Sequence, residues 1–522
     1  MVTVDRLARL VPTTVCIYSY LSRSPIRMPM PAAAACATSR TATYRRRQPE
    51  RTVLYRTVQT HLATWLELAQ DESGRSAPAH VEREFRRYLE CGILAHGFAR
   101  ARCEDCGHDF LIAFSCKGRG VCPSCNTRRM VETAAHLADH VLPRLPVRQW
   151  VLSVPKRLRY FLQTNPAVQN LALHICLSAV ERGLRAACPA GGNKARIGAV
   201  VFIHRFGALL NPHVHFHCVV VDGVFEAATE ACESVRFHET PALCSEQQAD
   251  IQRNIRRRLL RALTRRGLLE TDAAEEMAAW DHGGGFSLDA SVRIEVADRS
   301  GLERLLRYCA RPVFALERLR QIDPDHLVYE SIKPGPGGSV SLLLTPLELI
   351  DRLAALIPPP RRHRHRYYGV LAPNAPLREV VTAMARAKDE VTLPSAMTDA
   401  VPAAEPGTTA QKQNSPDEVA EAPAHRKAAR YVWALLLARI YEVLPLVCPK
   451  CGGEMRIIAF INDGPVIREI LSHLGEPTSA PRIAPARGPP LWELPVAGQA
   501  ERESDPQAQP APDYEFDQRV AW

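Results

Sequence analysis

The stretch that decides the fold is Asn211 to Phe225, which reads Asn-Pro-His-Val-His-Phe-His-Cys-Val-Val-Val-Asp-Gly-Val-Phe. Its apolar residues predict a β-strand, whose side chains alternate between two faces. His213, His215 and His217 therefore share one face, and the residues between them face a core. A lone histidine here would usually be an ordinary core or surface residue. Three imidazoles on one face are costly unless they are hydrated, hydrogen-bonded or metal-bound, so this strand predicts a metal site.

A second strand is predicted just before the first, at Ile197 to Phe206. The residues between them, Gly-Ala-Leu-Leu-Asn-Pro, suit a hairpin turn, and a symmetric hairpin would place His204 opposite His215. Strand-like and helix-like stretches alternate through this region. The further strand is expected at 150–154 and the helices at 251–269 and 302–319. The pattern predicts an α+β fold with a mainly antiparallel sheet and flanking helices.

The pair His215-Phe-His217, followed by a glycine-containing turn, resembles the HUH nucleases. These include rolling-circle replication initiators, conjugative relaxases and single-strand transposases. The resemblance implies that His215 and His217 hold one divalent metal, Mg²⁺ or Mn²⁺. His204 resembles the third ligand that relaxases draw from a preceding strand, and His213 is either a ligand or a phosphate contact.

The same resemblance implies a tyrosine nucleophile on a helix facing the metal. The tyrosine would attack a phosphodiester and leave a 5′-phosphotyrosine link with a free 3′-hydroxyl. Tyr308 is the main candidate, because its helix carries a leucine stripe on one side and arginines beside the tyrosine. The plain alternative is a buried core tyrosine. Tyr367 and Tyr368 are the next candidates, although they follow a basic run that better suits contacts with a nucleic-acid backbone.

Two Cys-x-x-Cys pairs separated by fifteen residues precede this region. Such pairs predict one tetrahedral zinc site, which is structural because four thiolates leave no open position for chemistry. Coincidence or a redox pair is the plain alternative, and Cys116 or His108 could replace a member of the set. The predicted ligands are Cys103, Cys106, Cys122 and Cys125.

The chain is basic, with a formal net charge of +10 and a pI of about 8.9. A basic balance favours nucleic acid as partner, although an anionic membrane surface would also attract it. Cationic side chains lie around the cysteine pairs and beside the candidate tyrosines, where they suit phosphate contacts or simply form solvated surface. The residues predicted to contact DNA are Arg119, Arg128, Arg129, Arg311 and Arg366.

No stretch of the 522 residues approaches the apolar length of a membrane span, and no signal-peptide core stands out. Six of the sixteen cysteines form Cys-x-x-Cys pairs, which favours metal binding over disulfides. These features predict a cytoplasmic bacterial protein, associated with the nucleoid when active, with no membrane partner.

A chain of this length should form several folded units. The third Cys-x-x-Cys pair, Cys448 and Cys451, is half a zinc knuckle, and it could use His425 or His473, pair across a dimer, or bind nothing. The predicted units are a disordered lead-in at 1–45, a helix plus zinc-binding domain at 46–130, an HUH nuclease domain at 131–395, a linker at 396–428, a small C-terminal unit at 429–475 and a disordered tail at 476–522.

The order of these motifs is similar to that of rolling-circle insertion-sequence transposases with an N-terminal zinc-binding domain. The similarity covers roughly residues 50 to 475. Founding members carry two tyrosines four residues apart, whereas Pro312 occupies the second position here, which resembles the single-tyrosine branch found in common-region elements. One tyrosine could complete both strand transfers through a second subunit in a homo-oligomer or through reuse of Tyr308.

The resemblance implies a transposase that nicks single-stranded element ends, becomes covalently attached and transfers the strand into target DNA. A plasmid replication initiator or relaxase would share this chemistry. The zinc module before the nuclease and the absence of a Walker A motif or other helicase signature argue against a multi-domain relaxase. A non-enzymatic zinc-dependent DNA-binding regulator would explain the cysteines and the charge. It would leave the histidine strand and the Tyr308 helix unexplained.

Overall fold

The computed structural model describes residues 47–69, 76–228, 234–241, 243–280, 285–335, 338–386, 448, 450–453 and 455–487. All of them belong to one compact unit, Ala42–Trp522. The predicted lead-in at 1–45, the linker at 396–428 and residues 429–447 of the predicted C-terminal unit lie outside the described residues.

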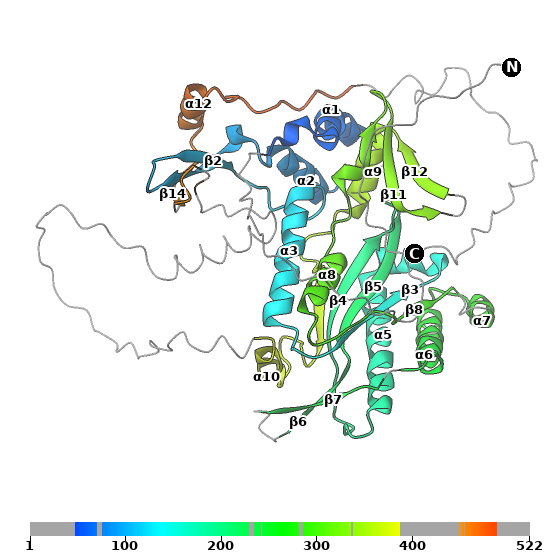
Figure 1. Cartoon of the computed structure of the whole chain (residues 1–522). Helices are drawn as coiled ribbons and strands as arrows, with labels where there is room; N and C mark the ends of the chain where they lie inside the picture. The colour runs from blue at the N-terminus through cyan, green and yellow to red at the C-terminus, as the bar shows by residue number, and fades with distance from the viewer. Residues whose placement is uncertain are drawn as a thin grey trace, which may run out of the picture. The chain divides into compact units, whose positions relative to one another are not determined.

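The histidine strand lies inside the largest sheet, in which every pairing is antiparallel (Figure 1). The order is β13 (His365–Gly369), β4 (Gly198–Phe206), β5 (Pro212–Val221), β3 (Val147–Ser153) and β8 (Ser287–Asp289), and β9 (Arg293–Ile294) also pairs with β3. The antiparallel sheet and the flanking helices confirm the predicted α+β class.

Helices cover both faces of this sheet because alternate residues of β5 enter two different cores. Phe216 and Cys218 pack in the core beneath four helices, α4 (Lys156–Thr164), α5 (Pro166–Ala187), α6 (Ser245–Thr264) and α7 (Thr271–Ala279). Val219 and Val221 pack in the core of the other face, with three helices, α3 (Pro123–His140), α8 (Arg299–Cys309) and α10 (Arg378–Ala383). The histidines lie on the face of α3 and α8.

The helix expected at 302–319 is shorter in the structure, where α8 ends at Cys309. Pro312 explains the difference, because proline lacks an N–H donor and disfavours helical backbone in the residue before it. The boundary expected at residue 130 is also wrong. It falls inside α3, whose first turn carries Cys125 and whose later turns pack on the central sheet.

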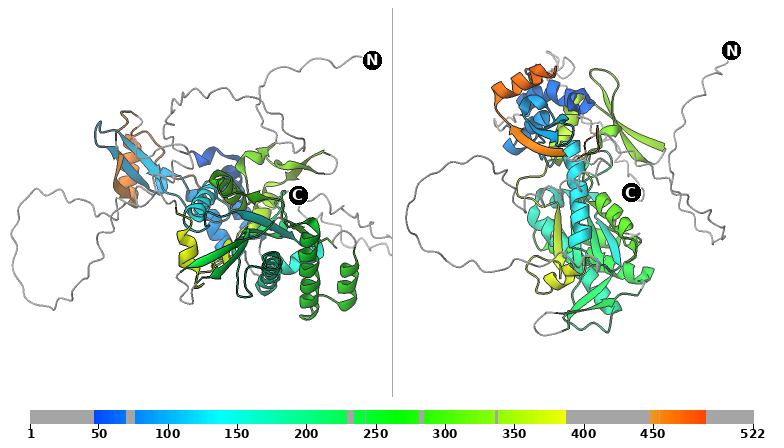
Figure 2. Two further views of the ribbon diagram at one scale, coloured as in Figure 1. Left: turned by 60° about the horizontal axis from the view of Figure 1, so that its bottom comes forward. Right: turned by 60° about the vertical axis from the view of Figure 1, so that its left-hand side comes forward.

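The N-terminal part contains α1 (Val53–Leu68), α2 (Ala79–Glu90), β1 (Phe98–Cys103) and β2 (Asp109–Ala113). A C-terminal strand, β14 (Met455–Ile461), pairs antiparallel with β1, giving the order β14-β1-β2. Helix α12 (Gly464–His473) follows it and packs on Leu94 and Phe98 through Ile467 and Leu471. Both views of Figure 2 show this orange segment beside the blue strands.

The C-terminal segment was therefore wrongly predicted as a separate unit, because its strand and helix complete the N-terminal sheet. The first residues of the predicted disordered tail are also ordered, because they form hydrogen bonds with α1. The N–H of Ala484 donates to the carbonyl of Gln59 at 2.9 Å, and that of Arg487 donates to Oγ1 of Thr64 at 2.9 Å.

Two smaller groups of strands complete the described fold. One sheet contains β10 (Leu319–Gln321), β11 (Leu327–Gly335) and β12 (Gly338–Leu344), followed by α9 (Pro346–Leu356), which packs against α1. The other contains β6 (Gly223–Ala227) and β7 (Val235–Glu239), and short 3-10 turns lie at Pro49–Arg51, Leu94–His96 and Leu316–Arg318. Among the described helices, none has the length and apolar character required to cross a bilayer.

Candidate functional site

The β4–β5 hairpin brings three histidines together. Its register pairs His204 with His215 across the two strands, as the symmetric hairpin predicted. His217 lies two residues further along β5 on the same face, and one ring nitrogen from each of the three lies within 4.8 Å of the others. The ring centroids of His204 and His217 are 4.3 Å apart, and each lies 5.0 Å from that of His215.

Each of these imidazoles has one nitrogen held by the protein. Nε2 of His204 donates to the carbonyl of Cys309 at 2.6 Å, and Nδ1 of His215 donates to the carbonyl of His213 at 3.1 Å. Nδ1 of His217 lies 2.9 Å from the side-chain amide of Gln149. Within the described residues, Nδ1 of His204 and Nε2 of His217 are buried without a hydrogen-bond partner. Buried nitrogens without a hydrogen-bond partner are costly, and these lie close enough together to be satisfied by one bound cation.

Burial keeps these imidazoles neutral, which leaves lone pairs available to a metal. Desolvation lowers the pKa of His217 to about 2 and that of His215 to about 4. Desolvation, reinforced by the neighbouring histidines, also places the pKa of His204 well below its usual value. A neutral imidazole is the form that binds metals.

The fourth predicted ligand, His213, lies outside this group of three. Its Nε2 is 3.1 Å from Oγ of Ser153, a residue of β3 at the same end of the sheet. His213 also supplies the carbonyl that orients His215. Its position suits a substrate contact better than a place in the ligand set.

Tyr308 lies at the end of α8, directly beside the histidines. Its ring centroid is 5.5 Å from that of His217, and the two rings meet edge to face. The side chain is 45% exposed, so the plain alternative of a buried core tyrosine is wrong. The bond from His204 to the carbonyl of Cys309 fastens this helix end to the sheet, because the last carbonyls of a helix lack partners within it.

Arginines surround Tyr308 unequally. Arg304 contacts Asp298 at 3.7 Å and Arg307 pairs with Glu303 at 2.7 Å. In the described part of the chain Arg311 has no carboxylate partner, and its guanidinium carbon lies 4.6 Å from the centroid of the Tyr308 ring. Arg311 is therefore the guanidinium left to meet an anion next to the tyrosine.

The two other candidate tyrosines occupy β13. The hydroxyl of Tyr367 lies 3.3 Å from Nε2 of His365, and its ring is covered by Arg378 at 5.0 Å. Tyr368 packs against the core on the opposite face of the sheet. Burial raises the pKa of both phenols. Neither has the contact with the histidines that Tyr308 has.

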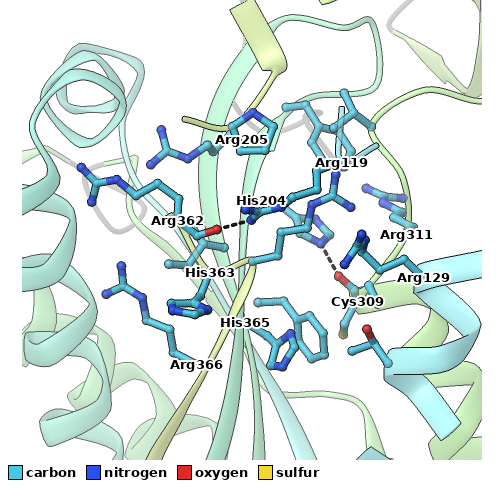
Figure 3. Close-up of a pocket in the computed structure, with 18 of the residues that line it drawn as sticks. Arg119, Arg129, His204, Arg205, Cys309, Arg311, Arg362, His363, His365 and Arg366 are labelled. Atoms are coloured by element: carbon cyan, nitrogen blue, oxygen red, sulfur yellow. Dashed lines mark hydrogen bonds between the residues drawn. The ribbon is translucent and has the colours of Figure 1, made fainter. Parts of the chain in front are cut away.

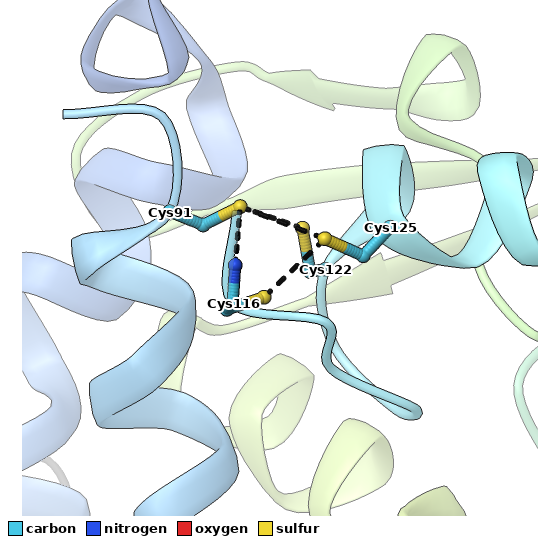
Figure 4. A group of neighbouring side chains, drawn as sticks. All are labelled: Cys91, Cys116, Cys122 and Cys125. Carbon is cyan, nitrogen blue, oxygen red and sulfur yellow. Dashed lines mark hydrogen bonds between the residues drawn. The ribbon is translucent and has the colours of Figure 1, made fainter. Parts of the chain in front are cut away.

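The cysteines form two clusters instead of the single predicted site. In the first, Cys122 and Cys125 join Cys91 and Cys116 (Figure 4). Their Sγ–Sγ contacts, Cys91–Cys125, Cys91–Cys122 and Cys116–Cys125, measure 3.7, 3.6 and 3.5 Å. Four thiolates about 2.3 Å from a tetrahedral zinc lie about 3.8 Å apart, so these distances fit such an ion.

The second cluster explains why the predicted set was wrong. Cys103 and Cys106 join the C-terminal pair Cys448 and Cys451, with all four sulfur atoms within 4.8 Å of one another. The turn at residues 103–107 extends from β1, and β1 pairs with β14, which follows Cys448 and Cys451 in the chain. Cys125 lies on a different element, α3. The two pairs that are close in sequence thus serve two different sites.

A basic pocket adjoins the histidine cluster, with His204 and Cys309 in its wall (Figure 3). Its cavity volume is about 350 Å³. Arginines reach it from the loop after Cys116, from α3, from β4, from the residues just after α8, and from β13 with the segment before it. They are Arg119, Arg129, Arg205, Arg311, Arg361, Arg362, Arg364 and Arg366.

No carboxylate lines this pocket among the described residues. Its arginines are held by uncharged groups instead: Arg364 donates to Oδ1 of Asn126 at 2.9 Å, and Arg205 donates to Oε1 of Gln169 at 3.0 Å. Burial, with the charge of Arg119, lowers the pKa of Arg364 to about 10, and burial also lowers that of Arg205. A bound polyanion would relieve this repulsion.

Four of the five arginines predicted to contact DNA, Arg119, Arg129, Arg311 and Arg366, line this pocket. Arg128 does not, and its guanidinium pairs with Glu132 at 2.7 Å. Sequence reasoning missed Cys91 and Gln149. Cys91 has no motif around it, and Gln149 looks like any polar residue of a strand until β3 is placed beside β5.

Two family models match the chain. Residues 58–154 match a model described as "Transposase zinc-binding domain", of the IS91 family, and this range contains the whole first cysteine cluster. Residues 198–378 match a model described as "Putative transposase", and this range contains the three histidines, Tyr308 and Arg366 of β13. Comparisons with curated proteins and with solved structures gave no match.

Proposed function

We propose that this chain, a transposase by both of its domain matches, cuts and rejoins single-stranded DNA through Tyr308. The observation that carries the proposal is the placement of Tyr308, an exposed tyrosine whose ring lies 5.5 Å from that of His217 in a cluster of three neutral histidines. This is the arrangement that the resemblance to HUH nucleases implied.

The three histidines fit a divalent cation, Mg²⁺ or Mn²⁺, because buried nitrogens of His204 and His217 lack any other partner within the described residues. Such an ion, when bound, withdraws charge from the phosphate oxygens of the scissile bond. His204 has a second task, since its bond to the Cys309 carbonyl fixes the helix end that presents Tyr308.

In the proposed reaction the Tyr308 oxygen forms a bond to phosphorus and the bond from phosphorus to the 3′ oxygen breaks. The phenolic proton is lost to solvent, to which the side chain is open, and the departing 3′ oxygen gains one. The product is a 5′-phosphotyrosine link and a free 3′-hydroxyl. Reversal with a different 3′-hydroxyl rejoins the strand in a new place, which is the transfer of rolling-circle transposition.

The basic pocket holds the strand on one side of this centre. Arg311 belongs to both places, because it lines the pocket and also covers the Tyr308 ring. The first zinc cluster shapes the pocket too: the loop between Cys116 and Cys122 carries Arg119, whose backbone N–H donates to Glu84 at 2.6 Å. We infer that zinc holds this loop so that Arg119 meets a phosphate.

A covalent-adduct assay tests the proposal. The full chain is incubated with end-labelled single strands from element ends, with Mn²⁺, and separated under denaturing conditions. We expect a protein–DNA adduct with the wild type and with Tyr367→Phe, and its loss with Tyr308→Phe or after chelation. An adduct that survives Tyr308→Phe overturns the choice of nucleophile. If no variant forms an adduct while zinc-dependent DNA binding persists, a DNA-binding regulator becomes the better reading.

A further inference from the structure

The C-terminal pair Cys448 and Cys451 lies outside both matched domains, at 58–154 and 198–378. It meets Cys103 and Cys106, more than three hundred residues earlier in the chain. The Sγ atoms of Cys103 and Cys451 are 3.4 Å apart, and those of Cys106 and Cys448 are 3.5 Å apart. These separations are longer than a disulfide and close to the spacing of thiolates on one tetrahedral zinc.

The two halves of this cluster have the same backbone conformation, that of a zinc knuckle, here a Cys-x-x-Cys-Gly turn. In the first, Gly107 N–H donates to the Cys103 carbonyl at 3.2 Å, and Cys103 N–H donates to the His108 carbonyl at 2.8 Å. In the second, Gly452 N–H donates to the Cys448 carbonyl at 2.9 Å, and Cys448 N–H donates to the Gly453 carbonyl at 2.8 Å.

The glycines make these turns feasible, because Gly107 has φ +69° and Gly452 has φ +78°, the region that other residues avoid. The N–H of Lys450 donates to Sγ of Cys448 at 3.4 Å, which would stabilise a thiolate there. The knuckles also face each other closely. A Cβ on Gly453 would lie 1.8 Å from the Asp105 carboxylate, so the Asp105 side chain would have to move to accommodate any larger residue there.

We propose that Cys103, Cys106, Cys448 and Cys451 bind a second structural zinc ion, which fastens the C-terminal segment to the N-terminal sheet. The cluster has four ligands and no open position, so the ion has no part in strand cleavage. Strands β1 and β14 prepare the site, because their antiparallel pairing ends at Cys103 opposite Met455, just beyond the second knuckle.

Residue-resolved alkylation of the wild-type chain tests this without any mutation. Cys106 and Cys451 are exposed, as is Cys244, which belongs to no cluster. We expect iodoacetamide to modify Cys244 at once, and Cys106 and Cys451 only after a zinc chelator is added. Equal reactivity of all three in the untreated protein would overturn the proposal. So would protection that a reductant removes and a chelator does not, since that result identifies disulfides.

Metal content gives the second measurement. Elemental analysis of the purified full chain should show that Cys448→Ser/Cys451→Ser lowers zinc by about one equivalent, while Cys244→Ser leaves it unchanged. Circular dichroism shows whether the double variant is folded. A folded double variant with undiminished zinc, or iron in place of zinc in the wild type, would contradict the proposal.

Discussion

Each imidazole of the histidine cluster is oriented by a hydrogen bond to the ring nitrogen that would not bind the metal. A metal ligand needs its free nitrogen aimed at the ion, and a hydrogen bond to the other nitrogen fixes both the tautomer and the ring orientation. Carbonyls of Cys309 and His213 do this for His204 and His215. The amide of Gln149 does it for His217, with its nitrogen 2.9 Å from Nδ1. With the amide turned so that its oxygen takes this place, Gln149 accepts the Nδ1 proton and leaves the Nε2 lone pair free for a metal.

At this scale we predict that Gln149→Leu lowers Mn²⁺ affinity by about 10- to 100-fold, because the ring of His217 loses its orientation. Gln149→Glu keeps an acceptor and should retain most of the affinity. The matched control is Gln248→Leu on α6, which removes a glutamine whose amide donates to the carbonyl of Leu243, just before that helix. Calorimetric titration of Mn²⁺ measures all three, and unchanged affinity in Gln149→Leu would show that this residue does not position His217.

At the scale of elements, period-two alternation predicted β5 and its histidine face, because a strand buried on one side leaves its pattern in the sequence. The prediction of a symmetric hairpin placed His204 opposite His215 correctly, although the register shifts between His204 and Phe206, close to the turn. Long-range pairing left no such pattern. Nothing local to Cys103 indicates that β14 will lie beside β1, and this pairing decides which cysteines share a metal.

The segment leading into β13 is a second case in which the sequence does not reveal long-range contacts. Its arginines read as a basic patch in the sequence, and only the fold shows that they line one pocket with Arg119 and Arg311. Their side chains reach the pocket from elements far apart in the chain. The chemistry of the residues was therefore predictable, while their convergence required the tertiary structure.

We predict that Arg362→Gln and Arg366→Gln each weaken single-strand binding, because each removes a phosphate contact. Log affinity falls as log salt concentration rises, and each variant should make this fall shallower by about one unit of slope. Arg253→Gln on α6, an exposed arginine paired with Asp250, should leave both quantities unchanged. Fluorescence anisotropy over a series of salt concentrations measures the slope. A slope unaffected in both pocket variants would place the strand elsewhere.

For the whole molecule, the C-terminal segment completes the N-terminal zinc-binding part through one strand, one helix and the second cysteine cluster. A bound zinc adds free energy on the order of 10 kcal/mol in small zinc peptides, so the cluster should dominate this attachment. Along the sequence the C-terminal segment follows the residues after β13, whereas the proposed zinc would join it to the end of β1.

We predict that a protease site inserted within 396–428 can be cut without releasing the C-terminal fragment. The wild-type fragment should co-elute with the remainder of the protein in size-exclusion chromatography. With Cys448→Ser/Cys451→Ser the cut fragment should separate, since the β14 pairing, the α12 contacts and the hydrogen bonds of Ala484 and Arg487 to α1 must then hold it without the metal. Equal retention in both proteins would mean that the metal contributes little to the attachment.

The most direct measurement for the central claim is to locate the attached nucleotide. The adduct formed with Mn²⁺ is digested with protease and nuclease, and the modified peptide is sequenced by mass spectrometry. We expect a single modified residue, Tyr308, carrying the 5′-phosphate of the downstream strand, with a free 3′-hydroxyl on the released strand. A nucleotide on Tyr367, Tyr368 or a residue of another type, or a 3′-phosphate link to Tyr308, would contradict the mechanism proposed for the histidine cluster and its neighbouring helix.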